Sequence, residues 1–580
     1  MQKPVLLFLA SLIGVSLAGC ANLMDTTEPA KPVKPQAPAD TAKVEEIHYA
    51  EFDPEVLYLL LSAEVAGQRG RYDITLLHYI KAAQRSRDKG VIRRALRIAQ
   101  SLNGDNAQQQ MASLWLEVEP DSLEAHRVLA IQAVKRSQLD RALNHMEQIM
   151  GLGGDADFDS LAAMASQLSP DKQQELLGLY RQLAERHPDN IEIEYSIALL
   201  LKINDQPATA LERLTPLLEA HPNFQPAIIL KGDLLYQTGL KTAALDYLLQ
   251  HTRKFPGNRQ MGTLYGRMLV GEGEMRAAQD EFARLVQQFP DVPGLRLSHA
   301  LVAVENGELD TARQDLIGLI EQGDHENEAH FYLGKIADME NHPQQAIGYY
   351  EQVEEGPQYF PALSRASVLR AEAGDVDGAL ANIRQLRATN PQQSENFWLL
   401  EINLLLEQGR TDKAFDSANQ ALTEIPDSVR IRYARAMLLD GMARTEEAEA
   451  DLRRVLDAEP NNSVALNALG YILATRTDRL EEAEALISRA LEIDPSNPAI
   501  LDSMGWVLFR QERFEPALTY LKQAYEAFPD PEVAAHFGEL LWRIGEQEQA
   551  RIVWRSALDD NPNHPILRET VLRLTGEQEL

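Results

Sequence analysis

Proline recurs along this chain of 580 residues at intervals of about 34, and no other feature restricts the fold as strongly. Asp324 stands where a proline is missing between Pro290 and Pro357, and the same phase extends backwards to Pro120. Because proline ends a helix and biases the residue before it away from helical angles, each proline predicts a turn between two repeats. The prolines that keep the phase after Pro120 are Pro188, Pro222, Pro256, Pro290, Pro357, Pro391, Pro426, Pro460, Pro495, Pro529 and Pro562.

Two columns of small residues share this period. Small side chains at two fixed points of each repeat let two antiparallel helices approach closely, and the apolar residues elsewhere keep the helical spacing of three and four. The first column is Ala142, Ala210, Ala244, Ala278, Ala312, Ala346, Ala379, Ala414, Ala448, Ala483, Ala517 and Ala550. The second is Ala130, Ala198, Gly232, Gly266, Ala300, Gly334, Ala436, Gly470 and Gly505.

The pattern resembles the tetratricopeptide repeat (TPR), a helix–turn–helix unit of 34 residues. The match is best from Leu466 to Pro495, where Gly470, Ala483 and Ala490 stand at the family's small positions. The resemblance covers 120–562 well and is weaker, though in phase, from 54 to 120. It implies an all-α solenoid of about 13 to 15 repeats, wound into a right-handed superhelix whose first helices line the concave face.

The N-terminus carries the pattern of a lipoprotein signal. A basic start precedes the apolar stretch Val5–Leu17, which is too short to span a bilayer but suits a signal-peptide core. The stretch ends in Leu17-Ala18-Gly19-Cys20, which resembles the lipobox of bacterial lipoproteins. We therefore expect Cys20 to carry diacylglycerol and an acyl chain such as palmitate, which would anchor the chain in a membrane without spanning it. Because Asp is absent after Cys20, the resemblance favours the outer membrane, with the protein facing the periplasm.

These patterns divide the chain into five parts. Residues 1–19 are the predicted signal peptide, and 20–45 are the lipidated cysteine with a proline-rich linker. Within that linker, prolines recur every third residue from Pro29, the period of a polyproline II helix. The remaining parts are degenerate N-terminal helical repeats at 46–120, the TPR array at 121–562, and a C-terminal capping helix with its tail at 563–580. Asp53-Pro54 predicts the cap and first position of the first helix.

Composition and missing motifs exclude several classes of function. The chain has 56 Lys and Arg against 87 Asp and Glu, a net charge of −31, which opposes binding to a nucleic acid backbone. A single Cys excludes an internal disulfide and a Cys-based zinc site. No dinucleotide-binding, phosphate-binding or nucleophile-elbow motif is present. We therefore predict no enzyme activity, no nucleic acid partner and no cofactor beyond the lipid on Cys20.

Two short motifs resemble metal sites without meeting their requirements. His325 and His330 are five residues apart, so on a helix their side chains point about 140° apart and do not hold one metal. Asp375-Val376-Asp377-Gly378 lacks the later ligands of a calcium loop. Its place in the repeat predicts a turn and a helix cap instead, and we predict no metal site.

A basic stretch stands out in this acidic chain. Residues Lys81–Arg97 contain seven basic side chains and one acidic one. One interpretation is a dock for anionic lipid or an acidic partner; the other is a solvated face that balances acidic neighbours. The candidate dock consists of Arg85, Arg87, Arg93, Arg94 and Arg97.

The TPR resemblance also indicates where partners bind. In that family the fifth and ninth residues of each first helix face the concave groove, and exposed aromatic side chains there are typical of protein-binding surfaces. Two interpretations stand for each ring: it binds a partner, or it packs between repeats. The candidate residues are Tyr195, Phe331, Trp398, Tyr433, Tyr471 and Trp506.

A lipid anchor, a stiff spacer and a peptide-binding solenoid together describe a tethered adaptor. The layout resembles that of lipoprotein adaptors that bind a periplasmic carboxyl-terminal processing protease. The resemblance implies two kinds of partner, the protease and its protein substrates, such as peptidoglycan hydrolases. The alternative is a structural lipoprotein of an envelope machine for exopolysaccharide export, pilus secretin assembly or outer-membrane protein assembly.

Overall fold

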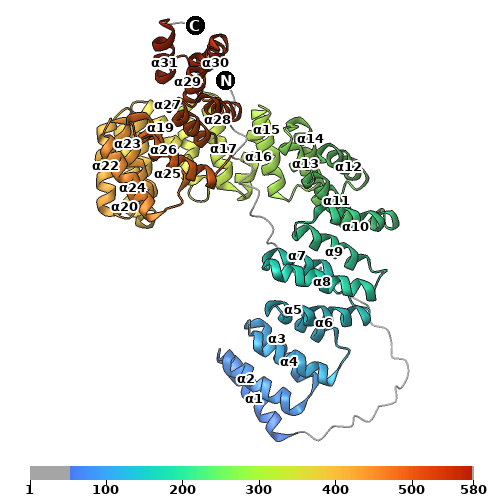
Figure 1. Ribbon diagram of the computed structural model, residues 1–580. Coiled ribbons are helices and arrows are strands. Elements are labelled where there is room, and N and C mark those ends of the chain that lie inside the picture. The colour runs from blue at the N-terminus through green and yellow to red at the C-terminus, as the bar shows by residue number, and fades with distance from the viewer. Residues whose placement is uncertain (1–52, 578–580) are drawn as a thin grey trace. The chain divides into compact units, whose positions relative to one another are not determined.

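The computed structural model describes residues 53–577, and these residues form 31 α-helices and two short 3-10 helices (Figure 1). No β-strand occurs among them, so the predicted all-α class is confirmed. The predictions for the signal peptide, Cys20 and the proline-rich linker concern residues outside the described range.

The described residues divide into two compact units, 53–325 and 326–577, and the division falls beside Asp324, where the proline column is interrupted. The helices of the first unit are α1 (Pro54–Gln68), α2 (Tyr72–Ser86), α3 (Lys89–Ser101), α4 (Asp105–Val118), α5 (Leu123–Lys135), α6 (Leu139–Gly151), α7 (Phe158–Met164), η1 (Ala165–Gln167), α8 (Pro170–Arg186), α9 (Ile191–Ile203), α10 (Pro207–Ala220), α11 (Gln225–Gln237), α12 (Lys241–Lys254), α13 (Arg259–Gly271), α14 (Met275–Gln288), α15 (Pro293–Glu305) and α16 (Leu309–Gln322).

The helices of the second unit are α17 (Glu326–Met339), α18 (Pro343–Tyr350), α19 (Tyr359–Glu372), α20 (Val376–Thr389), η2 (Pro391–Gln393), α21 (Ser394–Glu407), α22 (Thr411–Glu424), α23 (Val429–Gly441), α24 (Thr445–Ala458), α25 (Ser463–Arg476), α26 (Leu480–Ile493), α27 (Pro498–Arg510), α28 (Phe514–Ala527), α29 (Pro531–Arg543), α30 (Gln547–Asp560) and α31 (Pro565–Thr575). In both units together, α1–α30 form fifteen pairs of a first and a second helix, which agrees with the predicted 13 to 15 repeats. The closing helix α31 follows the last pair.

The column prolines lie in the turns between a second helix and the next first helix, as predicted. The residue before Pro188 is His187, which ends α8 at φ −133°, and His221 before Pro222 ends α10 at φ −128°. The backbone angles of both residues lie outside the α-helical region, as the clash with the following proline ring requires. Pro170 is off the phase because it occupies the first turn of α8, after η1. Asp53 caps α1 by accepting a hydrogen bond from the Glu55 backbone nitrogen at 2.9 Å.

The two columns of small residues hold the helices of each pair together. All twelve alanines of the first column are fully buried. In the second column, a β-carbon added at Gly505 would lie 2.5 Å from Leu521 Cγ, and one at Gly470 would lie 2.5 Å from Ile487 Cγ1. The second helix therefore packs a large side chain directly onto the backbone of the first. Gly538 extends this column and lies under Trp554 of α30; the sequence pattern did not identify it.

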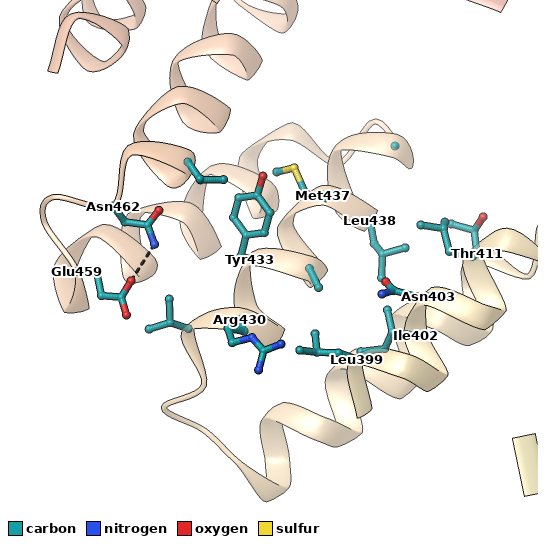
Figure 2. A pocket seen from close by; sticks show the side chains of 15 residues that line it. Leu399, Ile402, Asn403, Thr411, Arg430, Tyr433, Met437, Leu438, Glu459 and Asn462 are labelled. Atoms are coloured by element: carbon teal, nitrogen blue, oxygen red, sulfur yellow. Dashed lines mark hydrogen bonds between the residues drawn. The ribbon is translucent and has the colours of Figure 1, made fainter. Parts of the chain in front are cut away.

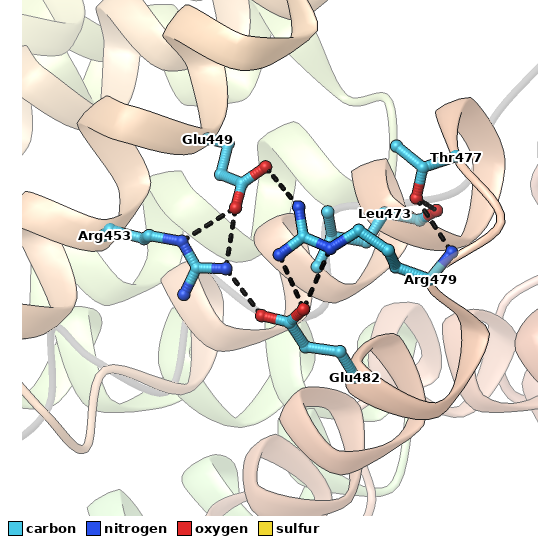
Figure 3. Close-up of polar contacts among 6 residues, drawn as sticks. All are labelled: Glu449, Arg453, Leu473, Thr477, Arg479 and Glu482. Carbon is cyan, nitrogen blue, oxygen red and sulfur yellow. Dashed lines mark hydrogen bonds and ion pairs between the residues drawn. The ribbon is translucent and has the colours of Figure 1, made fainter.

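Ion pairs on the surface connect successive repeats. Arg479, at the N-terminus of α26, bonds Glu482 of its own helix at 2.6 Å and Glu449 of α24 at 2.7 Å (Figure 3). Arg453 of α24 completes the ring with Glu449 at 2.7 Å and Glu482 at 2.5 Å. An isolated exposed pair contributes about 0–1 kcal/mol, but a closed network of four charges orients each member and resists screening better.

Candidate functional site

An open groove of about 660 Å³ crosses the first helices α21, α23 and α25 in the second unit (Figure 2). Most of its lining is apolar, and α23 forms its floor. Its lining residues are Leu399, Ile402, Asn403, Leu406, Thr411, Val429, Arg430, Tyr433, Ala434, Met437, Leu438, Gly441, Glu459, Asn462 and Val464. Of the predicted concave aromatics, Tyr433 lines this groove.

The apolar side chains of the groove are accessible to a partner. Leu406 of α21 and Val464 of α25 are 47% and 54% exposed. Tyr433 and Met437 lie one turn apart on α23 and are half-buried. Contiguous exposed apolar side chains are typical of protein-binding surfaces, and Tyr and Met are enriched at such surfaces. The groove therefore suits an apolar segment of a protein partner.

Polar groups stand around the apolar surface. Arg430 donates to Asn396 Oδ1 at 2.7 Å. Asn462 donates to Glu459 at 2.8 Å (Figure 2). Asn462 also caps α25, because its Oδ1 accepts a hydrogen bond from the Ala465 backbone nitrogen. These groups can form hydrogen bonds with the backbone of a bound segment and fix its register.

Trp398 was predicted to share this wall, but the structure contradicts that prediction. The indole is 1% exposed, and its Nε1 donates to Glu424 at 3.0 Å. The Arg387 guanidinium lies 3.3 Å from the ring centroid and also bonds the buried Glu401 at 2.8 Å. The second interpretation, packing between repeats, is therefore correct for Trp398. Truncating this ring would test the core and not the groove.

Tyr471 belongs to a hydrogen-bonded cluster on α25, α27 and α29, and Trp506 joins that cluster by ring stacking. His536 of α29 is buried and contacts Asp502 of α27 at 2.9 Å through Nδ1. The Tyr471 hydroxyl donates to Glu532 at 2.5 Å and lies 3.5 Å from His536 Nε2. The Trp506 ring stacks on the His536 ring with their centroids 4.1 Å apart. Both predicted aromatics are therefore half-buried and committed largely to contacts between repeats.

The protonation state of His536 depends on the carboxylates around it. Burial alone would lower the pKa of His536, but the charge and hydrogen bond of Asp502, with the charges of Glu532 and Glu539, raise the pKa above its ordinary value. Burial and the Glu532 charge likewise raise the pKa of Tyr471. The protonated imidazolium is thus the form that the folded C-terminal repeats favour.

We expect the second unit to lose stability as the pH rises through the folded pKa of His536. A pKa that is higher in the folded state contributes stability fully below the unfolded value of about 6.5, and this contribution disappears above the folded value. Thermal unfolding of the full chain between pH 5.5 and 9 measures the effect. His536→Gln should flatten that part of the profile; a profile with the same slope in the variant would contradict the assignment.

The other two predicted aromatics lie in separate units and are partly packed. Tyr195 meets Phe224 edge to face with ring centroids 5.6 Å apart, and burial raises the pKa of Tyr195 to about 12. Phe331 lies against Tyr350, with centroids 5.8 Å apart. Both rings are half-buried, so part of each ring stays accessible while the rest packs within the array.

The basic stretch is largely neutralised by acidic side chains of neighbouring helices. Arg85 pairs with Asp53 and Glu55, each at 2.5 Å. Arg87 pairs with Glu117 at 3.0 Å, and Arg93 lies 3.9 Å from Glu124 and over the Trp115 ring. These contacts favour the interpretation of a balanced face for Arg85, Arg87 and Arg93. For Arg94 and Arg97, the dock stays a prediction.

Asp375 adopts the cap predicted for it, whereas His325 lies outside the helix on which it was placed with His330. Asp375 caps α20 by accepting from the Gly378 backbone nitrogen at 3.0 Å. His325 precedes α17 at φ 50°, and His330 lies inside that helix. In the described residues 53–577, no cluster of three or more His, Cys, Asp or Glu side chains is arranged to hold a metal ion. Within the same range, no helix combines the length and apolar character that crossing a bilayer requires.

Comparison with known proteins identifies the repeats. A relative from Pseudomonas aeruginosa, a TPR repeat-containing protein, is 38% identical over the whole of this chain and 97% of its own length. The tetratricopeptide repeat model matches residues 195–259, 297–360, 366–429, 433–498 and 503–565. The chain belongs to the tetratricopeptide repeat family. The predicted TPR fold is thereby confirmed, and the groove is formed by first helices of TPR units.

Solved structures of TPR proteins also align with the chain. A tetratricopeptide repeat protein from Parabacteroides merdae covers 43% of this chain and 99% of its own, with 16% identity and a TM-score of 0.35. A thermophilic TPR protein from Thermus thermophilus covers 30% of this chain and 96% of its own, with 21% identity and a TM-score of 0.28. A chain of the APC/C hetero-tetramer Cut9–Hcn1 covers 90% of this chain and 97% of its own, with 13% identity and a TM-score of 0.31.

Proposed function

We propose that this TPR protein is a non-catalytic adaptor that binds a periplasmic carboxyl-terminal processing protease and presents protein substrates to it. The observation that carries the binding role is the apolar groove over α21, α23 and α25, with accessible side chains at its rim. TPR scaffolds suggest protein–protein interaction as a class. The substrates we propose are peptidoglycan hydrolases, in line with the adaptor lipoproteins that the sequence layout resembles.

The adaptor is proposed to work by raising local concentration. A chain that holds a protease and a substrate on one scaffold converts their encounter into an intramolecular event. A groove with a mostly apolar lining and a few polar groups beside it can bind an extended or helical segment without demanding one sequence. The scaffold itself supplies no catalytic group in this proposal, and the protease performs the cleavage.

A pull-down from detergent-solubilised membranes tests the partner. The full chain should retain a carboxyl-terminal processing protease, and a Tyr433→Ala, Met437→Ala variant should lose the substrate, the protease or both. Recovery of a secretin or an outer-membrane barrel in place of the protease would instead support a structural role in an envelope machine. An Ile552→Ala variant, which changes an exposed residue of α30 away from the groove, serves as the matched control.

The proposed anchor is the lipid on Cys20, which would hold the scaffold at the outer membrane facing the periplasm. Cys20→Ala should release the protein into the soluble periplasmic fraction, because two or more acyl chains provide the stable attachment. Ala21→Asp is the matched control: it should preserve lipidation but shift the protein toward inner-membrane fractions on a density gradient. Persistent outer-membrane fractionation of the alanine variant would contradict the anchor.

A further inference from the structure

The first helix of the array carries an apolar stripe that no described residue covers. Tyr58, Leu61 and Val65 of α1 are 65%, 58% and 47% exposed, and Leu57 adjoins them. At 100° per residue these four side chains fall within an arc of about 100°, without a charged residue between them. The stripe extends over more than two turns of α1.

The repeat phase explains what this stripe corresponds to. Ala63 of α1 is the equivalent of Ala198 in α9, because Thr75 follows it by the twelve residues that separate Ala198 from Ala210. Counted from these positions, Tyr58, Leu61 and Val65 correspond to three residues of α9 that are fully buried. The preceding helices α7 and α8 pack against α9. The three residues of α9 are Ile193, Ser196 and Leu200. In α27 the equivalent trio is at most 3% exposed: Ile500, Ser503 and Val507. The stripe on α1 is therefore the surface that later first helices bury against the repeat before them.

A polar residue beside the stripe, Arg69, also stands at a repeat position that contacts the preceding repeat in later first helices. Arg69 is the C-cap of α1, and the equivalent C-cap residues of α5, α15 and α27 all donate to the first turns of the second helices before them. Arg136 reaches Asn106 Oδ1 at 2.7 Å, and Asn306 reaches the Met275 carbonyl at 3.1 Å. Gln511 reaches the Leu480 carbonyl at 3.4 Å and, one turn further along α26, the Glu484 carboxylate at 2.9 Å. Among the described residues, the exposed Arg69 side chain forms no hydrogen bond or ion pair.

From these observations we infer that α1 is a docking surface for an amphipathic helix of a partner protein, which occupies the place of a preceding second helix. Its apolar face packs on Tyr58, Leu61 and Val65, and a carboxylate in its first turn pairs with Arg69. Two features favour this occupant: the stripe continues the interface that already joins the repeats, and a guanidinium binds a carboxylate more strongly than a neutral acceptor. Terminal repeats of a solenoid otherwise need a polar outer face for solubility. This inference goes beyond the proposed function, since the groove on α21–α25 is a separate surface.

Site-specific photocrosslinking in intact cells tests the inference. In the full chain, Tyr58 is replaced by p-benzoylphenylalanine, and the matched control carries the same replacement at Ile552, which is 63% exposed on α30. We expect an adduct from position 58, absent at 552, whose crosslinked peptide maps by mass spectrometry to a partner helix with an acidic first turn. Arg69→Glu should lower the adduct yield by about tenfold or more, since a like charge then faces the carboxylate, whereas Arg69→Lys should preserve most of it.

The other results would overturn the inference. Adducts that map to a second copy of this chain would assign the stripe to self-association, and adducts within residues 21–52 of the same chain would assign it to an internal contact. If crosslinking from position 58 gave no adduct, or if the adduct yield were unchanged by Arg69→Glu, no such helix would dock on α1. Unchanged helical circular dichroism verifies folding of each variant. The groove variant Tyr433→Ala, Met437→Ala should keep the adduct, which separates this test from the proposed function.

Discussion

Gly505→Leu is expected to destabilise the last repeats of the array by at least about 1–3 kcal/mol. A β-carbon at position 505 would lie 2.5 Å from Leu521 Cγ and 3.0 Å from the Leu521 backbone nitrogen. The side chain of Leu521 can rotate, but the backbone of α28 can move only if α27 and α28 separate. Since Leu521 is fully buried in the core of the second unit, separation also opens that core.

Hydrogen exchange and thermal unfolding of the full chain measure this effect. Amides between 461 and 529 should lose most protection, because each repeat contacts chiefly its neighbours. Gly348→Leu is the matched control: position 348 lies inside α18, and nothing comes within 4 Å of an added β-carbon. That change should be neutral or stabilising, by up to about 1 kcal/mol from helix propensity. Equal protection in the Gly505 variant and the wild type would mean that the repeat phase is wrong.

Removing the floor of the groove is expected to weaken partner binding by about thirty-fold or more. The variant combines Tyr433→Ala with Met437→Ala, which deletes two half-buried side chains one turn apart on α23. Truncating a central interface aromatic commonly costs about 2 kcal/mol, which corresponds to that change in affinity. Because both side chains border an open groove and Ala favours helix, the helical circular dichroism should be retained.

Isothermal titration of the purified partner against the two proteins gives the affinities. The contrasting variant is Trp398→Ala, whose ring is in the core and is stacked by Arg387. It should lower the melting temperature of the second unit, because a large buried side chain is lost. One result would contradict this assignment: the Trp398 variant loses affinity but keeps its stability, whereas the groove variant keeps its affinity but loses stability. Trp398 would then be a binding residue, and Tyr433 and Met437 would be core residues.

The repeat architecture was predictable from the sequence because it depends on local and periodic features. A proline in the inter-repeat turn and an alanine at the closest helix contact both act through local backbone sterics, and both recur in most repeats independently of distant residues. The twelve column alanines are accordingly all buried. Gly538 was not predictable from the proline spacing, because a small residue is required there by the side chain of Trp554, which packs against it.

The candidate binding residues were less predictable because exposure at one repeat position depends on neighbours from other helices. Trp398 and Tyr433 stand at the same position of successive first helices, yet Arg387 of α20 covers the first, whereas the second borders the groove. Tyr471 is similarly occupied by Glu532, which lies 61 residues later in the chain. The rim residues Leu406 and Val464 carried no signal, since a single apolar residue on a first helix looks the same whether it is covered or open.

Reconstituted proteolysis tests the central proposal most directly. A purified carboxyl-terminal processing protease is incubated with a peptidoglycan hydrolase alone, with the full chain, and with the Tyr433→Ala, Met437→Ala variant. We expect the full chain to accelerate cleavage, the groove variant to lose most of that acceleration, and the chain without protease to cleave nothing. Cleavage at the same rate with and without the full chain would contradict the adaptor role, and cleavage by the chain alone would contradict the absence of catalysis.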